Sequence, residues 1–394
     1  MIRLTRDNGI PRHILLMMAT MAAFTVANLY YNQPLLDMIC HDTGISQVQA
    51  NMITVITQIG YALGLFFVVP LADMVPVRRI VVIGMSLAAA SAIVIGVSGN
   101  AWILWGASLT LGLSSIMPQL FIPMATLYSR PENKTRNLGY LASGIMTGIV
   151  SARAVSGYVG EWFGWRFMFF IVAVLMLLGM LVSLKMMPQV NQTFHGSYRQ
   201  LMRTVGSIFM SNPRIRLYSF RPAMSFASMM CIWSCMAFHL AGDPFHAGSD
   251  VVGMLGLCGV AGALAASGVG KIVPKVGIHR MSVVGGWLQV AAWLTAWLWG
   301  DSYAGLIVAI IVADIGAQCL QVSNQSATLR QLPEATNRVN TIFMTIFFIG
   351  GSLGTFFSGL GWSHSGWNGV CIVGACFASA TLLLSLYERF NARP

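Results

Sequence analysis

The segment Thr126–Arg136 reads TLYSRPENKTR, and the segment Thr328–Arg338, 202 residues further along the chain, reads TLRQLPEATNR. Both fit the pattern T-L-x-x-x-P-E-x-x-x-R. A series of matches at one spacing indicates an internal repeat, so we predict that the chain consists of two similar halves. The same spacing also pairs Gln119 with Gln321, Ser156-Gly157 with Ser358-Gly359, and Gly164-Trp165 with Gly366-Trp367.

Apolar stretches surround both segments and recur along the whole chain. Of the 394 residues, 56% are hydrophobic and 9% are charged, whereas a soluble domain has roughly 25% charged residues. Stretches of about 20 apolar residues are long enough to cross a bilayer as helices, and helices satisfy their own backbone hydrogen bonds in lipid. We therefore predict an all-α membrane protein with about twelve transmembrane helices.

A longer polar linker at residues 188–214 separates two sets of apolar stretches. We predict an N-terminal six-helix bundle at residues 1–187 and a C-terminal six-helix bundle at residues 215–394. Because an even number of spans separates the two copies of the repeat, both copies have the same orientation in the membrane. The halves are then related by a pseudo-twofold axis along the membrane normal.

The positions of the charges predict how the chain is oriented. Twenty of the 23 Lys and Arg residues fall in the termini, the linker and the alternate loops that share their side, and the opposite loops hold only Arg166. Basic loops stay in the cytoplasm, so we expect a multi-pass protein of the cell inner (plasma) membrane with both termini cytoplasmic. The same asymmetry explains the net charge of +11 without a nucleic-acid partner.

Several function classes lack their motifs in this sequence. The seven Cys and seven His residues show no zinc spacing, the P-loop pattern is absent, and no catalytic grouping can be placed at one depth. We expect no enzyme activity, no metal and no cofactor. A solute carrier driven by an ion gradient is the leading interpretation, with a channel or a membrane-embedded sensor as the alternative of another class.

Two stretches resemble a known family. NLYYNQPLL at Asn28–Leu36, and GIMTGIVSARAVSG at Gly144–Gly157 followed by Gly164-Trp165-Arg166, are similar to signatures of bacterial drug:proton antiporters of the major facilitator superfamily. The resemblance implies two pseudo-symmetric six-helix bundles, a monomer, and transport by alternating access. It implies proton-coupled efflux of a drug-like compound or metabolite, with proton-coupled uptake as the alternative. The chain departs from the usual Gly-Pro of the second stretch at Gly148-Ile149.

The loop after the second predicted helix resembles the superfamily's gating loop. It keeps the acid and the basic pair of G-x-L-A-D-R-x-G-R-R as Asp73, Arg78 and Arg79, and it lacks both glycines. The resemblance implies a cytoplasmic gate in which Asp73 pairs with cations of a neighbouring helix in one state and releases them in the other. Alternatively, the loop is a membrane-edge turn whose arginines only set the topology.

Three charged residues are candidates for proton or ion coupling. Asp314 lies about ten residues into a predicted helix, where burial costs roughly 2.5 to 3.5 kcal/mol and indicates a function. Its alternative role is a hydrogen bond between packed helices. Arg153 lies inside the fifth predicted helix and needs an acid, a carbonyl or a substrate anion as partner. Asp37 is a further candidate, near the outer edge of the membrane.

Uncharged polar residues are candidates for lining a substrate cavity. Tyr31 and Asn32 follow Asn28 by three and four residues, so the three share one helix face, and Pro34 can bend that helix. Interfacial anchoring of the tyrosines is the alternative. The other cavity candidates are Gln119 on the fourth predicted helix and Gln318, Gln321, Asn324 and Gln325 on the tenth.

Overall fold

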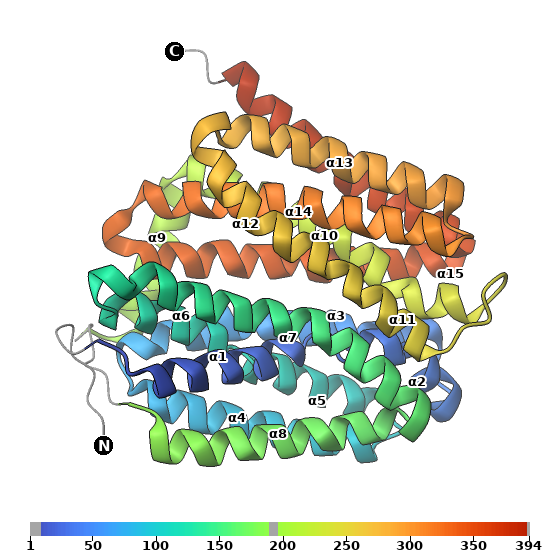
Figure 1. The fold of residues 1–394 in the computed structure, drawn as a ribbon, viewed down its shortest axis with the longest axis horizontal. Coiled ribbons are helices and arrows are strands. Elements are labelled where there is room, and N and C mark those ends of the chain that lie inside the picture. The colour runs from blue at the N-terminus through green and yellow to red at the C-terminus, as the bar shows by residue number, and fades with distance from the viewer. Residues whose placement is uncertain (1–8, 189–195, 392–394) are drawn as a thin grey trace.

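The computed structural model describes residues 9–188 and 196–391, and every regular element within these residues is a helix. The long helices lie side by side with roughly parallel axes (Figure 1). The start of α1 and the end of α15 lie at the same end of the bundle, at the left of Figure 1. We call this end the terminal side and the opposite end the far side.

Some of the apolar stretches in the first half of the chain do not form one continuous helix and are divided into shorter elements. Its elements are α1 (Arg12–Ala27), η1 (Gln33–Leu35), α2 (Leu36–Thr43), α3 (Gln47–Leu63), η2 (Gly64–Val68), η3 (Val69–Asp73), α4 (Val77–Val97), α5 (Ala101–Ser114), α6 (Met117–Tyr128), η4 (Pro131–Asn133), α7 (Lys134–Phe163) and α8 (Trp165–Met186). Pro34 and Pro118 each lie in the first turn of an element, where a missing N–H is tolerated. The chain therefore breaks just before each of them.

The second half begins with a helix that lies within the predicted linker. Its elements are α9 (Tyr198–Ser211), α10 (Pro213–Ala241), α11 (Ser249–Leu255), η5 (Gly256–Cys258), α12 (Gly259–Val276), α13 (Ile278–Trp299), α14 (Tyr303–Gln331), η6 (Pro333–Ala335) and α15 (Thr336–Asn391). Residues 189–195 of the predicted linker lie outside the described residues.

Ten helices among the described residues are long and apolar enough to cross a membrane, and α1 is a shorter apolar helix. The helix α15 contains a reversal, because Ser365 and Gly366 have non-helical backbone angles and the backbones of Gly361 and Gly369 meet across it. Counted as two arms, α15 brings the number of crossings to twelve. The prediction of an all-α membrane protein is confirmed.

The two halves of the chain pack closely on the far side. Asn51 of α3 donates a hydrogen bond to the carbonyl of Thr355 at 2.7 Å. The helix α7 approaches α11 so closely that a Cβ on Gly157 would lie 2.4 Å from the carbonyl oxygen of Ser249. Only a glycine permits such a backbone contact, so the far side is closed in this structure.

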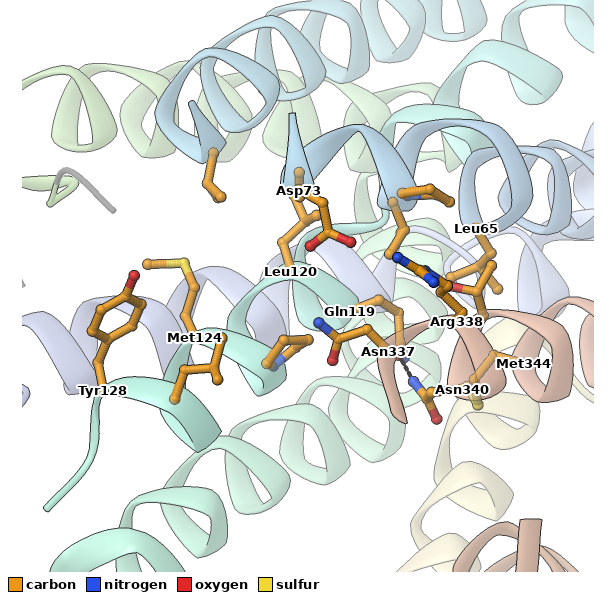
Figure 2. A pocket seen from close by; sticks show the side chains of 17 residues that line it. Leu65, Asp73, Gln119, Leu120, Met124, Tyr128, Asn337, Arg338, Asn340 and Met344 are labelled. Atoms are coloured by element: carbon orange, nitrogen blue, oxygen red, sulfur yellow. Dashed lines mark hydrogen bonds between the residues drawn. The ribbon is translucent and has the colours of Figure 1, made fainter. Parts of the chain in front are cut away.

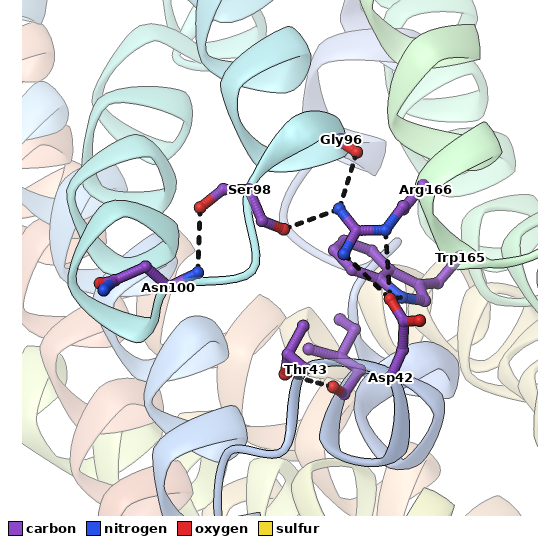
Figure 3. Close-up of polar contacts among 8 residues, drawn as sticks. Asp42, Thr43, Gly96, Ser98, Asn100, Trp165 and Arg166 are labelled. Carbon is purple, nitrogen blue, oxygen red and sulfur yellow. Dashed lines mark hydrogen bonds and ion pairs between the residues drawn. The ribbon is translucent and has the colours of Figure 1, made fainter.

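A polar cluster fixes the far ends of the first-half helices to one another. The Arg166 guanidinium at the start of α8 forms an ion pair with Asp42 at 2.9 Å and donates to the carbonyls of Gly96 and Ser98 at the end of α4. Trp165 donates its indole N–H to the same carboxylate at 3.1 Å. Figure 3 shows that Arg166 thereby joins α2, α4 and α8.

The helix α9 packs on the terminal side of the second half. A capping box, in which Ser197 and Gln200 exchange hydrogen bonds, begins it. Its buried residues Val205 and Ile208 form an apolar cluster with the starts of α10 and α15. The linker is therefore, in part, an amphipathic helix.

Candidate functional site

A pocket opens between the halves on the terminal side, between η2, η3, α6 and the start of α15 (Figure 2). Its walls are mainly apolar, with a few polar side chains directed into it, as is typical of small-molecule sites. The polar and charged residues that line it are Asp73, Gln119, Tyr128, Asn337, Arg338, Asn340 and Thr341.

A chain of amides crosses this pocket from one half to the other. Asn340 of α15 donates its side-chain N–H to the Gln119 oxygen on α6 at 3.3 Å, and Gln325 of α14 donates to the Asn340 oxygen at 3.0 Å. The structure thus brings together two predicted cavity residues, Gln119 and Gln325. The residue that joins them, Asn340, was not predicted, because an asparagine near a helix start has the ordinary appearance of a capping residue.

The three predicted gate residues point in different directions. Asp73 ends η3 and lines the pocket. Arg78 donates a hydrogen bond to the carbonyl of Leu184 on α8, within the same half. Arg79 is exposed. Asp73 alone of the three therefore faces the space between the halves.

A second polar group lies deeper, between the pocket and the closed far side. Arg153 on α7 is 3% exposed, and its Nε donates to the Gln33 oxygen at 2.7 Å. Its guanidinium lies 4.1 Å from the ring centre of Trp233 on α10 and 4.8 Å from that of Tyr30. One terminal nitrogen of Arg153, Nη2, has no hydrogen-bond partner among the described residues. A desolvated cation thus sits where the halves meet.

Asp314 approaches the same turn that packs on Arg153: a Cβ on Gly256 would lie 2.6 Å from the Arg153 Cβ, and one on Gly259 would lie 3.7 Å from the Asp314 Oδ2. It is 8% exposed on α14, and its charge and that of Arg153 interact electrostatically. Gly259 and Gly262 of α12 leave room for it, since a Cβ on Gly262 would lie 3.0 Å from the Asp314 Cβ. The two predicted coupling residues of opposite charge are therefore brought into one buried region.

The residues of the stretch Asn28–Leu36 have two kinds of partner: some contact other residues of the first half, and Gln33 contacts the buried Arg153. Asn28 donates to Ser115 at 3.0 Å, inside the first half, and Tyr31 and Asn32 are 6% and 3% exposed. Gln33, which was not among the predicted site residues, holds Arg153. The sequence did contain a signal for Gln33, because it is a polar residue next to Pro34 within an apolar stretch.

None of the four α14 candidates lines the pocket itself, and Gln325 reaches it through Asn340. Asn324 is fully buried, donates to Ser282 at 3.0 Å and accepts from Arg221 at 3.2 Å. Gln318 and Gln321 are half-buried on α14 and are not among the residues lining the pocket. Arg221 was also missed, because it stands near the start of its predicted span, where basic residues usually reach the interface.

Asp37 lies on the far side, away from the buried charges. It is half-buried in α2, with its carboxylate 3.6 Å from His41 Nε2. Burial raises the pKa of the Asp37 carboxyl, and the charge of His41 opposes that rise. Asp37 therefore belongs to the outer surface of the bundle and not to the region between Arg153 and Asp314.

A family model, "Major Facilitator Superfamily", matches residues 15–355. The chain belongs to this superfamily. This major facilitator protein is a transporter and not an enzyme. It is 37% identical to "Uncharacterized transporter YgaY" of Escherichia coli O157:H7, over 94% of this chain and 94% of that protein. It is 22% identical to "Inner membrane transport protein YnfM" of Escherichia coli (strain K12), over 95% and 92% of the two chains.

Solved structures share the fold at low sequence identity. The nucleoside transporter NupG superimposes with a TM-score of 0.72 and 14% identity, covering 96% of this chain and 100% of that one. A bacterial homolog of the human lysosomal transporter Spinster superimposes with a TM-score of 0.70 and 14% identity, covering 96% and 95%. The major facilitator fold that the resemblance implied is confirmed.

Proposed function

We propose that this major facilitator protein is a secondary active transporter that exports a small drug-like compound or metabolite in exchange for protons by alternating access. The observation that carries the proposal is the burial of two opposite charges, Arg153 and Asp314, around the same turn at residues 256–259, where the two halves meet. A buried carboxylate that interacts with a cation can take up a proton and so change the force between the halves.

The distribution of contacts supports alternating access. The halves pack on the far side through Asn51 and Gly157, while the pocket lies on the terminal side. In this proposal residues 1–187 and 215–394 rock against each other about the buried charges. Gln119 and Asn340 bind the solute in the pocket, and the amide chain that continues to Gln325 breaks when the solute enters. Asp73 acts as a gate at the pocket mouth.

The direction of transport and the orientation rest on sequence. The stretches Asn28–Leu36 and Gly144–Gly157 resemble drug:proton antiporters, and the chain is 24% identical to "Probable sugar efflux transporter" of Haemophilus influenzae (strain 86-028NP), over 76% and 74% of the two chains. Basic residues on the terminal side favour a cytoplasmic location for both termini. The pocket then opens to the cytoplasm, as an exporter that loads there requires.

The test begins with a thermal-shift screen of the purified protein against small-molecule libraries at two pH values, since a ligand of the folded state raises its melting temperature. The best ligand is then followed in proteoliposomes with an imposed pH gradient. We expect export of the solute when the side opposite the cytoplasmic face is the more acidic one. Asp314→Asn should abolish this proton-driven component, while solute exchange without a gradient persists.

Asp301→Asn, at an exposed position in the loop before α14, is the matched control and should transport normally. Full proton-driven transport by the Asp314→Asn variant would remove Asp314 from the mechanism. Uptake driven by the same gradient would reverse the proposed direction, and solute flux without exchange would indicate a channel.

A further inference from the structure

A second hollow lies on the terminal side of the first half, between the start of α1 and the start of α7. It encloses about 900 Å³, including space open to solvent, and shares no residue with the pocket of Figure 2. Its polar lining residues are Arg12, Arg130, Asn133, Arg136, Asn137 and Tyr140.

This hollow is strongly basic. Three arginines line it, and none of its described lining residues carries a carboxylate. The stem of Arg130 packs over Gly9, where an added Cβ would lie 3.2 Å from the Arg130 Cγ. Asn137 is 4% exposed and donates to Ser129 at 2.9 Å, which ties the start of α7 to the end of α6. These contacts hold the corner between α6 and α7, which carries Arg130 and Arg136, in place.

The second half builds the equivalent place differently. At the repeat spacing of 202, Pro11-Arg12 corresponds to Pro213-Arg214. Four polar residues of the hollow correspond to apolar ones, in the order Arg130 to Leu332, Asn133 to Ala335, Asn137 to Val339 and Tyr140 to Ile342. All four apolar residues belong to the cluster covered by Val205 and Ile208 of α9.

One half therefore presents an apolar seat for a helix of the chain itself, and the other presents a basic hollow at the same position. Polar residues at four positions would be a poor seat for an apolar helix, because its binding would bury unpaired polar groups. The chemistry of the hollow instead matches an anion, and guanidinium groups bind phosphate oxygens through paired N–H donors.

We propose that this hollow binds the phosphate of an anionic phospholipid head group from the leaflet that borders the terminal side. The hollow lies at the ends of α1 and α7, where a membrane surface meets the protein. Ile10 and Leu15 supply an apolar floor beside the arginines, which suits the glycerol end of a lipid and offers nothing to a free phosphate ion. Basic pockets between membrane helices recognise such head groups.

The inference does not depend on what the protein transports. It is tested on the full-length protein by measuring retained lipid with native mass spectrometry and the melting temperature in detergent, with phosphatidylglycerol, phosphatidylcholine or inorganic phosphate added. We expect phosphatidylglycerol alone to be retained and to raise the melting temperature. The double variant Arg12→Gln/Arg136→Gln should need at least about tenfold more phosphatidylglycerol for the same shift.

Arg214→Gln/Arg330→Gln is the matched control, because it removes two exposed positive charges from the same side of the second half. It should bind the lipid as the unaltered protein does. If the double variant of the hollow does not fold, Arg12→Gln alone, at an exposed residue of the first turn of α1, replaces it. Equal retention of phosphatidylglycerol by the hollow variant and the control would overturn the proposal. Equal stabilisation by inorganic phosphate would replace the lipid with a free anion.

Discussion

Arg221 shows how a single buried cation can hold four helices of the second half together. It has no exposed surface in α10, and its guanidinium donates to Ser282 of α13, Asn324 of α14 and the carbonyl of Leu384 in α15. These three acceptors come from three different helices, so the guanidinium links them to α10. Arg221 therefore has the contacts of a structural residue, in contrast to Arg153 at the junction of the halves.

We predict that Arg221→Leu destabilises the protein by about 3 kcal/mol, because Asn324 and Ser282 lose a buried partner. Thermal unfolding in detergent measures the effect. Arg214→Leu, at an exposed position two turns earlier in α10, is the control and should leave the melting temperature unchanged within error. Equal melting temperatures for the two variants would show that the Arg221 contacts contribute little.

Asp37 gives a pH-dependent prediction on the far side. Because burial raises its folded pKa above that of the unfolded chain, the protonated form is favoured in the folded state. The stability that this contributes is present at low pH and is lost as the pH rises through the raised pKa. Asp37→Asn mimics the protonated form, so it should match the unaltered protein at about pH 4 and be more stable than it at about pH 8.

Melting curves of both proteins across this range provide the measurement. His41 faces the carboxylate, and its charge lowers the pKa of Asp37, so His41→Gln should raise that pKa further and widen the difference between the two proteins. A difference that is constant with pH would contradict the burial of Asp37 as its source.

At the scale of helices, the glycines of α7 control how closely the halves approach. A Cβ on Gly157 would also lie 2.9 Å from the Cα of Gly253, in addition to its contact with the Ser249 carbonyl. These atoms are backbone and cannot rotate away. Gly139 lies on the same helix and has nothing within 4 Å of its Cβ position.

We therefore predict that Gly157→Ala disfavours the far-side-closed state by about 1 to 3 kcal/mol, the usual cost of overpacking. Gly139→Ala should have no such effect. Labelling rates of a cysteine introduced at Ser249 report access from the far side, and the rate should rise in the first variant only. An unchanged rate in both would mean that α7 and α11 do not form the closure.

The helices themselves were largely predictable from the sequence, and their interruptions were not. Apolar length predicts a span because lipid enforces it. The break between α5 and α6 falls within one apolar stretch, where length alone carries no signal. The helix α9 was assigned to a polar linker because it is short and only one of its faces is apolar. The apolar surface that stabilises it comes from α10 and α15.

The candidate site was predictable only in part, for a related reason. A charge in an apolar stretch is visible in the sequence, so Asp314 and Arg153 could be singled out. Their partners could not, since Gln33 and Trp233 come from helices far apart in the chain. Asn340 joins Gln119 to Gln325 across the pocket, and that arrangement depends on how the halves are docked.

At the scale of the whole molecule, the repeat accounts for the architecture and its imperfections account for specialised surfaces. Identical residues mark the loop after α6 and its counterpart after α14. The differences concentrate where the halves have different tasks, as at Arg130 and Leu332. Two similar halves can exchange roles about a central axis, which is the structural requirement for opening each side in turn.

The most direct test of alternating access is a pair of spin-label distances measured by pulsed electron resonance, with Cys376 and the half-buried Cys40 and Cys258 replaced by serine. One pair of labels, at His41 and His364, spans the far side, and the other, at Thr135 and Asn337, spans the terminal side; all four positions are exposed. Proteins in nanodiscs are compared at low and high pH and with Asp314→Asn. We predict that one distance lengthens as the other shortens, and that Asp314→Asn fixes the balance regardless of pH. Two distances that stay constant, or that lengthen together, would contradict the proposed mechanism.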